Sequence, residues 1–240
     1  MTRGSFISNH WGYDMNKAAQ CWIAEFIGTF ALCFVGIAAI FHLGNVPGGL
    51  VGIALAHGLT IAVMASATAA ISGGHLNPAV TIGLYAARKI DAPLAGVYII
   101  AQLVGAVTAA AVLLPVLGQN AIAGGTPALQ VINGEEVGPW TGIVIEAILT
   151  FFLVFVIYGT AVDKRAPQVG GLFIGLTVAL DILAGGPITG AAMNPARHFG
   201  PAVLSGSVVM KEQIWLYWIG PALGGVVAAL VYRYTLEKSD

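Results

Sequence analysis

The chain has 240 residues, of which 58% are hydrophobic and only 9% are charged. Soluble domains carry about 25% charged residues, so a chain this poor in charge needs lipid to cover part of its surface. Its formal net charge of −1 argues against a nucleic-acid partner, which a basic surface would attract. We therefore expect an integral membrane protein embedded in a lipid bilayer.

Six apolar segments follow one another along the chain, and each is long enough to cross a bilayer. They cover residues 18–41, 50–70, 92–116, 138–160, 168–186 and 214–235. A hydrocarbon core of about 30 Å needs about 20 helical residues, which these lengths supply. The fifth segment is expected to stop at Gly185-Gly186-Pro187. The residues before the first segment do not show a basic start, a short apolar run and a small-residue cleavage site in that order, as a signal peptide would. We therefore expect the first span to be retained.

Two short motifs interrupt this series, one in each half of the chain. They are Asn77-Pro78-Ala79 and Asn194-Pro195-Ala196. Asn is a favoured N-cap and Pro is favoured at the first helical position, so each motif predicts the start of a helix. A helix over 78–88 would rise about 16 Å, roughly half a bilayer. We expect two re-entrant half-helices whose N-termini meet near the midplane.

The two halves of the chain also repeat each other. Glu25 precedes Asn77 by 52 residues, and Glu146 precedes Asn194 by 48. Each half, about 18–116 and 138–235, has three spans, so the second half enters the membrane in the opposite sense. The expected fold is an all-α polytopic membrane protein with six transmembrane helices and two half-helices in an inverted repeat. Residues 1–240 would form a single membrane channel domain.

The distribution of basic residues orients the spans. If the N-terminus is cytoplasmic, eight of the ten Lys and Arg residues lie on the cytoplasmic side. They are Arg3, Lys17, Arg88, Lys89, Lys164, Arg165, Arg233 and Lys238. The positive-inside rule then places both termini in the cytoplasm. We further expect a cell membrane, plasma or inner, rather than an organelle membrane.

The half-helices indicate what could pass between them. A helix N-terminus carries about half a positive charge, so two facing N-termini repel cations. Asn77 and Asn194 would present amide N–H donors in the same space, where a water molecule can accept two hydrogen bonds. Such a water directs its own protons away along the pore, which interrupts proton hopping. The alternative is a pair of tight packing turns without a pore.

The paired motifs, the second followed directly by Arg197, resemble those of the aquaporin (major intrinsic protein) family along nearly the whole chain. The resemblance implies one pore in each subunit, exclusion of protons and ions, and assembly as a homotetramer. The sequence has neither a metal-ligand cluster nor a nucleophile with a partnered base, so we expect no metal, no cofactor and no enzymatic activity.

The resemblance also identifies a selectivity filter. Arg197 would line the narrowest constriction, and the three other positions fall on His57, Ile182 and Ala191. Strict water channels usually carry Phe, His and a small residue at those three positions, whereas this set resembles the tonoplast-intrinsic group. Ile in place of a ring should widen the aperture. We therefore expect a passive channel for water and for ammonia, hydrogen peroxide or urea, with His57 as a donor or acceptor for the solute.

Each of the two polar filter residues could instead have a purely structural role. Arg197 could instead form a salt bridge to Glu136 or Glu212 in an outer loop, and His57 could be a packed histidine bonded to a backbone carbonyl. By the same resemblance, Glu25 and Glu146 accept hydrogen bonds from the re-entrant loops.

Three further polar residues lie near the pore motifs. His75 is expected to bond within the first re-entrant loop. Asp181 either faces the outer vestibule or, as we favour, caps a helix break at Gly185-Gly186. His198 matches neither the water-type nor the glycerol-type pattern.

Three other functions remain open from the sequence. In glycerol channels, Asp follows the Arg and Lys follows four residues later, whereas this chain has His198 and Ala202 there. A secondary transporter would place carboxylates at the half-helix tips, which here carry Asn. A chiefly structural membrane protein with the same fold would conduct nothing.

Overall fold

The computed structural model describes residues 17–166 and 169–237, and these residues form six long helices, two half-helices and several short elements. The long helices are α1 (Lys17–Leu43), α2 (Gly49–Ser72), α4 (Ala92–Leu117), α6 (Pro139–Ile157), α7 (Gly170–Thr189) and α10 (Ile214–Val231). The half-helices are α3 (Pro78–Ala86) and α8 (Pro195–Leu204). The six expected spans are confirmed, since six apolar helical stretches are long enough to cross a membrane. Arg3 and Lys238, used above to orient the chain, lie outside the described residues.

Two of the spans are extended by a π-helical turn. The turn η1 (Tyr158–Val162) continues α6, and η2 (Tyr232–Leu236) continues α10. The connections between α4 and α6 and before α10 contain structure that the sequence did not predict. The first of them has the short helix α5 (Gln119–Gly124) and a hairpin of β1 (Val131–Ile132) and β2 (Glu135–Glu136), while α9 (Val208–Glu212) precedes α10.

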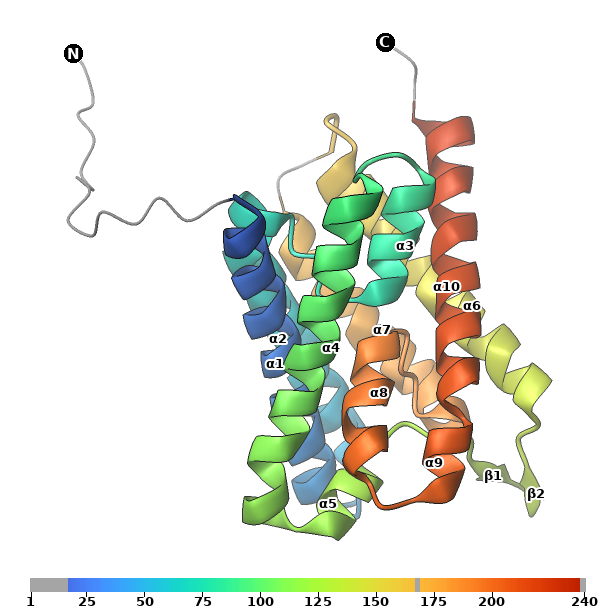
Figure 1. The fold of residues 1–240 in the computed structure, drawn as a ribbon. Helices are drawn as coiled ribbons and strands as arrows, with labels where there is room; N and C mark the ends of the chain where they lie inside the picture. Colours follow the sequence, from blue (N-terminus) through green and yellow to red (C-terminus); the bar gives the residue numbers. More distant parts are fainter. Residues whose placement is uncertain (1–16, 167–168, 238–240) are drawn as a thin grey trace, which may run out of the picture.

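The half-helices lie inside the bundle and enter it from opposite ends (Figure 1). Asn77 caps α3 and accepts a hydrogen bond from Ala79 N at 2.8 Å. Asn194 caps α8 and accepts hydrogen bonds from Ala196 N at 3.0 Å and Arg197 N at 3.2 Å. Both Pro residues occupy the first helical position. The two motifs therefore begin helices for the local reasons predicted from the sequence.

Glycines bring the long helices together. A Cβ placed on Gly175 of α7 would lie 2.2 Å from Gly58 O of α2, and a Cβ on Gly58 would lie 2.5 Å from Gly175 O. A Cβ on Gly224 of α10 would lie 2.0 Å from Ala147 O of α6. No side chain fits at such separations, so these crossings depend on backbone approaching backbone, as small residues allow in membranes.

The fifth span differs from its prediction. Helix α7 continues through Gly185-Gly186-Pro187 and ends only at Gly190, which is left-handed at φ 77° and donates its N–H to Gly186 O. Pro187 lies in the last turn, where its fixed φ suits a helix and its missing N–H leaves one carbonyl without its helical partner. The expected stop at residue 186 is therefore wrong, because one lost hydrogen bond near a helix end does not terminate it.

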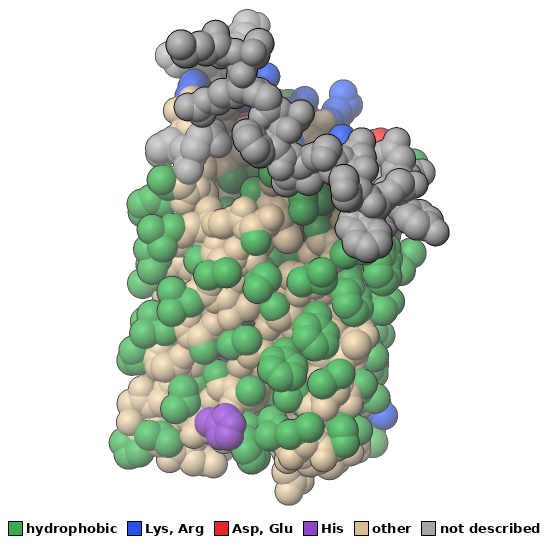
Figure 2. Space-filling model, turned by 90° about the vertical axis from the view of Figure 1, so that its left-hand side faces the viewer, with side chains coloured by type: hydrophobic (Ala, Val, Ile, Leu, Met, Phe, Trp, Pro, Cys, Tyr) green, Lys and Arg blue, Asp and Glu red, His purple; other side chains and the backbone are tan. Residues whose placement is uncertain are grey.

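The outer surface of the bundle is apolar. On the face shown in Figure 2, hydrophobic side chains are distributed among backbone and other side chains from the lower end up to the residues drawn in grey. Leu59 is 54% exposed, Ile100 58% and Leu180 65%, and each lies on a different long helix. Monomeric soluble proteins rarely expose so continuous an apolar surface. Lipid or another subunit must cover it.

The described ends of the chain lie at the same end of the bundle (Figure 1). There Lys89, which follows α3, donates to Glu237 at 2.7 Å. Arg165, which follows η1, donates to Leu236 O at 3.0 Å. The connections that the basic-residue count assigned to the cytoplasmic side therefore lie at this end of the bundle.

Candidate functional site

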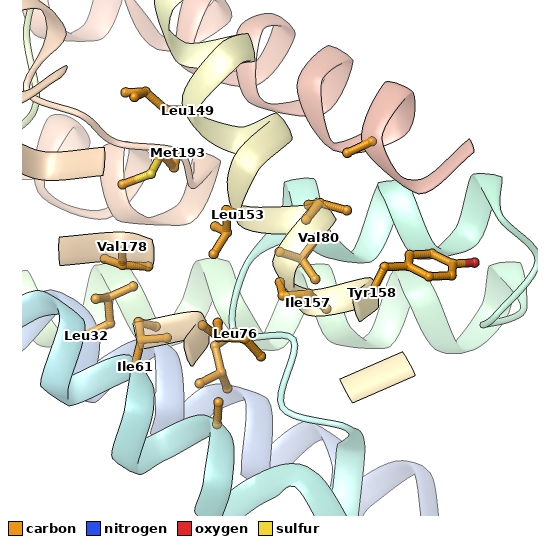
Figure 3. Close-up of a cluster of buried hydrophobic side chains, with 14 of the residues drawn as sticks. Leu32, Ile61, Leu76, Val80, Leu149, Leu153, Ile157, Tyr158, Val178 and Met193 are labelled. Atoms are coloured by element: carbon orange, nitrogen blue, oxygen red, sulfur yellow. The ribbon is translucent and has the colours of Figure 1, made fainter. Parts of the chain in front are cut away.

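A cavity lies between long helices of both repeats and the two half-helices. Its wall is mainly aliphatic, with polar groups from the re-entrant loops, from His57 and from Arg197. It is lined by Leu32, His57, Ile61, Gly74, His75, Leu76, Asn77, Val80, Leu153, Ile157, Ile174, Val178, Ile182, Ala191, Ala192, Met193, Asn194 and Arg197. Figure 3 shows part of the apolar wall, including Leu32, Ile61, Leu153 and Val178. All four residues of the expected filter and both capping Asn residues reach this cavity.

The two Asn side chains connect the repeats at the meeting point of the half-helices. Asn77 Nδ2 donates to Met193 O at 2.8 Å, and Asn194 Nδ2 donates to Leu76 O at 2.9 Å. A primary amide has two N–H donors, so each Asn keeps one donor beyond this cross-link. Both side chains line the cavity, which places two amide donors and two helix N-termini at one level of it.

The first re-entrant loop is held by the buried carboxylate of Glu25. Its Oε1 accepts from the Ser72 hydroxyl at 2.6 Å and from His75 N at 2.9 Å. Its Oε2 accepts from Leu76 N at 2.6 Å and from Gln102 Nε2 at 2.7 Å. Leu76 is left-handed at φ 51°, a conformation that costs free energy for a residue with a side chain. The carboxylate compensates by satisfying backbone N–H groups that the broken helix leaves open.

Glu146 holds the second loop in the same way but with fewer donors. Its Oε1 accepts from the Thr189 hydroxyl at 2.6 Å and from Ala192 N at 2.9 Å, and its Oε2 accepts from Met193 N at 2.7 Å. Ala191 and Met193 are left-handed at φ 45° and 51°. The two acids have the loop-supporting contacts that the family resemblance implied.

His75 lies within the first loop and against a neighbouring helix. Its Nδ1 is 3.1 Å from the hydroxyl of Thr81, and its ring meets Tyr98 edge to face with centroids 4.9 Å apart. Tyr98 in turn donates to Ser72 O at 2.6 Å. The bonding partner of the histidine therefore lies on half-helix α3, just beyond the loop in which the bond was expected.

On the polar side of the expected filter, His57 and Arg197 are hydrogen-bonded to each other. His57 Nδ1 lies 2.8 Å from Ile53 O, one turn earlier on α2. Its Nε2 lies 3.3 Å from both Nε and Nη2 of Arg197. A guanidinium can only donate, so Nε2 is the acceptor and Nδ1 carries the proton. The ring is therefore neutral, and its acceptor is engaged by Arg197, which corrects the expectation that His57 itself offers a free donor or acceptor to solutes.

Arg197 is fixed by a second bond, from Nη1 to Gly125 O at 2.8 Å. Glu136 is exposed in the outer hairpin and Glu212 is exposed in α9. Neither is an ion-pair partner of Arg197 in the part of the chain that the structure describes, so the salt-bridge alternative is wrong. The alternative given for His57 is confirmed in that the ring bonds a backbone carbonyl, although the residue also lines the cavity.

The other side of the filter is apolar. Ile182 on α7 and Ala191 in the second loop are each 5% exposed and line the cavity. The four residues of the expected filter therefore give the cavity one wall with guanidinium N–H donors and one wall of aliphatic carbon.

Asp181 occupies neither of its expected places. It is only 5% exposed and is not among the residues that line the cavity, and the continuous α7 leaves no break to cap. Its Oδ2 has no hydrogen-bond partner among the described residues. Nothing in its surroundings explains why this carboxylate is there.

His198 has a structural explanation that the sequence did not provide. It is fully buried and its ring stacks on Tyr217, with centroids 4.0 Å apart and an interplanar angle of 16°. Tyr217 donates to Thr189 O at 2.6 Å, as Tyr98 does in the first repeat. In each repeat a histidine thus packs on the tyrosine that bonds the loop, although one histidine comes from the loop and the other from the half-helix.

Two contributors to the site were missed by sequence reasoning. Gly125 supplies its carbonyl to Arg197, and Gln102 supplies an amide donor to Glu25. Gln102 could have been suspected, because a buried amide inside an apolar span needs a partner. Gly125 left no such signal, because any residue carries a carbonyl.

Comparison with known proteins gives one family. The model of the major intrinsic protein family matches residues 13–232. Aquaporin TIP4-4 of Zea mays is 44% identical over 220 residues, which cover 88% of this chain and 84% of the relative. The probable aquaporin TIP3-2 of Arabidopsis thaliana is 41% identical over 232 residues, covering 90% and 84%.

A solved structure shares the fold as well. The X-ray structure of the aquaglyceroporin from Plasmodium falciparum superposes with a TM-score of 0.77 at 27% identity. The match covers 91% of this chain and 97% of the other.

Proposed function

The chain belongs to the major intrinsic protein family, and from this premise we propose that it is a passive channel for water and for small neutral solutes such as ammonia, hydrogen peroxide and urea. The observation that carries the proposal is the pair of cross-bonded amides, Asn77 to Met193 O and Asn194 to Leu76 O, inside one cavity. We propose that the whole chain acts as a single channel domain, without a cofactor and without catalysis.

Charge is excluded by the half-helices. Their two N-termini add positive potential where the cavity passes between them. A water oxygen accepts from the free N–H of Asn77 and of Asn194, so its own protons point away along the cavity. A cation loses its hydration and meets that potential, and a proton finds no continuous chain of waters to follow.

The solute range follows from the two walls of the filter. A urea oxygen or an ammonia nitrogen can accept a hydrogen bond from the N–H groups of Arg197 that His57 and Gly125 leave free. Ile182 and Ala191 have no polar side-chain group, so they compete for none of the solute's hydrogen bonds. Their shape therefore sets an upper limit on solute size.

The test is stopped-flow light scattering on proteoliposomes that contain the purified protein. Fast shrinkage in sucrose reports water flux, and re-swelling in urea reports solute entry. The rise in internal pH after ammonium is added outside the liposomes reports the entry of ammonia. We expect all three rates to exceed those of empty liposomes, whereas water flux equal to that of empty liposomes would leave only a structural role for the fold.

A glycerol facilitator is the second candidate, because the solved structure with the same fold is an aquaglyceroporin. Against it, His198 and Ala202 stand where glycerol channels carry Asp and Lys. Glycerol as a third osmolyte separates the two candidates. Re-swelling in glycerol as fast as in urea would favour the facilitator, and urea alone would favour the narrower channel.

We also propose that four copies assemble in the bilayer and that both termini are cytoplasmic. The exposed apolar side chains on the long helices, such as Leu59 and Leu180, supply the surface for lipid and for neighbouring copies. Crosslinking in liposomes should give a ladder that ends at the tetramer, and tags at either terminus should be cleaved only from the cytoplasmic side. The expected preference for a cell membrane gains no support from the relatives, which carry TIP names.

A further inference from the structure

The ring of His57 is held on three sides. Its Nδ1 bonds to Ile53 O on its own helix, and its Nε2 accepts from Arg197. The third side is formed by α1 at Gly36. A Cβ placed on Gly36 would lie 2.4 Å from His57 Nε2, 3.0 Å from Cδ2 and 3.1 Å from Cε1. The imidazole therefore fills the space that any side chain at position 36 would need.

Nothing in the backbone requires a glycine at this position. Gly36 lies in the interior of α1 (Lys17–Leu43), well away from either end, and its φ is not left-handed. Glycine inside a helix is less stable than alanine, so the residue is locally unfavourable. It is buried, and it lies one turn beyond Leu32, a residue of the cavity wall. The close approach of His57 is the contact that accounts for it.

We propose that Gly36 is a positioning residue of the selectivity filter, because it lets the His57 ring rest against α1 and so determines both the aperture and the bond from Arg197. The inference rests on the solute range proposed above. A methyl group at position 36 meets Nε2, the same atom that accepts from Arg197. With Nδ1 anchored on α2, the ring can yield only by moving away from α1, toward the cavity.

The first measurement compares Gly36→Ala with the unmodified protein in proteoliposomes, as the ratio of urea to water permeability. We expect that ratio to fall about tenfold, within the range over which one methylene changes discrimination by a snug site. Water permeability should fall less, because water is smaller than the remaining gap. Gly96→Ala is the matched control, since a Cβ there meets nothing within 4 Å, and it should leave the ratio unchanged.

A double-variant comparison separates positioning of His57 from a general displacement of α1. In a His57→Ala background the ring is gone, so adding Gly36→Ala should change neither permeability. Equal losses in both backgrounds would overturn the proposal. If Gly36→Ala alone does not yield folded protein, the two backgrounds can be compared by stability. The double variant should then fold and be as thermostable as His57→Ala. A double variant that fails to fold would also overturn the proposal.

The outcomes also distinguish this inference from the proposed function. If His57→Ala leaves the ratio of urea to water unchanged, the filter assignment itself is wrong. If His57→Ala changes the ratio and Gly36→Ala does not, only the role of Gly36 is wrong.

Discussion

The two polar side chains of the proposed filter are held in place by their hydrogen-bond partners. Arg197 is 3% exposed and His57 is 4% exposed, yet neither forms an ion pair within the described chain. Arg197 gives one donor to Gly125 O and two to the His57 ring, so its remaining N–H groups are directed by fixed neighbours. Because these partners hold the polar wall in place, we expect substitutions in the opposite, aliphatic wall to change the width of the aperture.

Replacing Ile182 with Phe should therefore narrow the channel to water. The larger ring takes space directly from the cavity that Ile182 lines. We expect urea permeability to fall about tenfold or more while water permeability is largely kept, because one extra group in a snug site discriminates by 10- to 200-fold, roughly. Stopped-flow swelling in urea and shrinkage in sucrose measure both rates.

The neighbouring residue supplies the control for that substitution. Leu183 lies next to Ile182 on α7 but is 40% exposed, so Leu183→Phe adds the same ring outside the cavity. Both permeabilities should remain unchanged in this variant. Equal urea loss in the two variants would contradict a filter role for Ile182.

Glu146 gives a second prediction at the scale of single residues, for stability. Glu146→Gln keeps the shape of the side chain but replaces one acceptor oxygen with an NH2 donor. Both carboxylate oxygens receive backbone N–H donors, from Ala192 and from Met193. Whichever way the amide turns, one N–H faces another, and an unsatisfied buried donor costs about 1–3 kcal/mol. We expect a lower midpoint of thermal unfolding in detergent.

The matched control for this change is Glu136→Gln. Glu136 is an exposed residue of the outer hairpin, where an amide and a carboxylate are both hydrated. Its unfolding midpoint should equal that of the unmodified protein. A Glu146→Gln variant as stable as this control would mean that the carboxylate is not needed to hold the second loop.

At the scale of helices, the crossing of α2 and α7 depends on two glycines. Gly175→Ala should lower the free energy of unfolding by about 1–3 kcal/mol, since overpacking a fitted contact forces the backbones apart and its Cβ would lie 2.2 Å from Gly58 O. Thermal unfolding in detergent measures the loss. Gly96 lies in α4, where an added Cβ meets nothing within 4 Å. Gly96→Ala should therefore be neutral or slightly stabilising, because alanine favours the helix. A Gly175→Ala variant as stable as Gly96→Ala would contradict the prediction, because the close approach of α2 and α7 would then not limit the side chain at position 175.

The elements also show where sequence reasoning works and where it fails. The half-helices were predictable because their cause is local: an Asn that caps and a Pro that follows it occupy adjacent positions. The end of α7 was not, because the sequence Gly-Gly-Pro is a stop signal on average, yet here Pro187 lies in the final turn and the helix continues around it to Thr189. The pairing of His198 with Tyr217 joins two elements and leaves no periodic signal in either one.

At the scale of the whole molecule, the sequence predicted the architecture more fully than the site. Six apolar stretches and two repeated motifs are properties of composition and spacing, and they are sufficient to define an inverted repeat. The family resemblance predicted which residues form the filter, but it did not predict which residues hold their side chains in place. Gly125 and Gly36 touch Arg197 and His57 only once the outer connection and α1 have packed against the repeats. Contacts between distant segments are decided by the assembled fold.

A carboxylate at the end of the bundle where the chain finishes should make stability depend on pH. Asp163 follows η1 and accepts from Arg165 Nε at 2.9 Å and from Tyr232 OH at 3.3 Å. The bonds from Arg165 hold the pKa of the Asp163 carboxyl well below its usual range. In the unfolded chain that pKa returns to about 3.9. The stabilisation is therefore complete above the unfolded pKa and is lost as the pH falls from there through the lower folded pKa.

Asp163→Asn should abolish this dependence, because an amide does not titrate. Near neutral pH the variant should unfold at a lower temperature than the unmodified protein, and the difference should shrink as the pH is lowered from 7 toward 3. Glu136→Gln, which changes an exposed carboxylate, should show no such convergence. Thermal unfolding in detergent across that range provides the measurement. A difference that stays constant with pH would mean that Asp163 holds Arg165 and η2 by shape alone, and that its ionisation contributes nothing to joining the two ends of the second repeat.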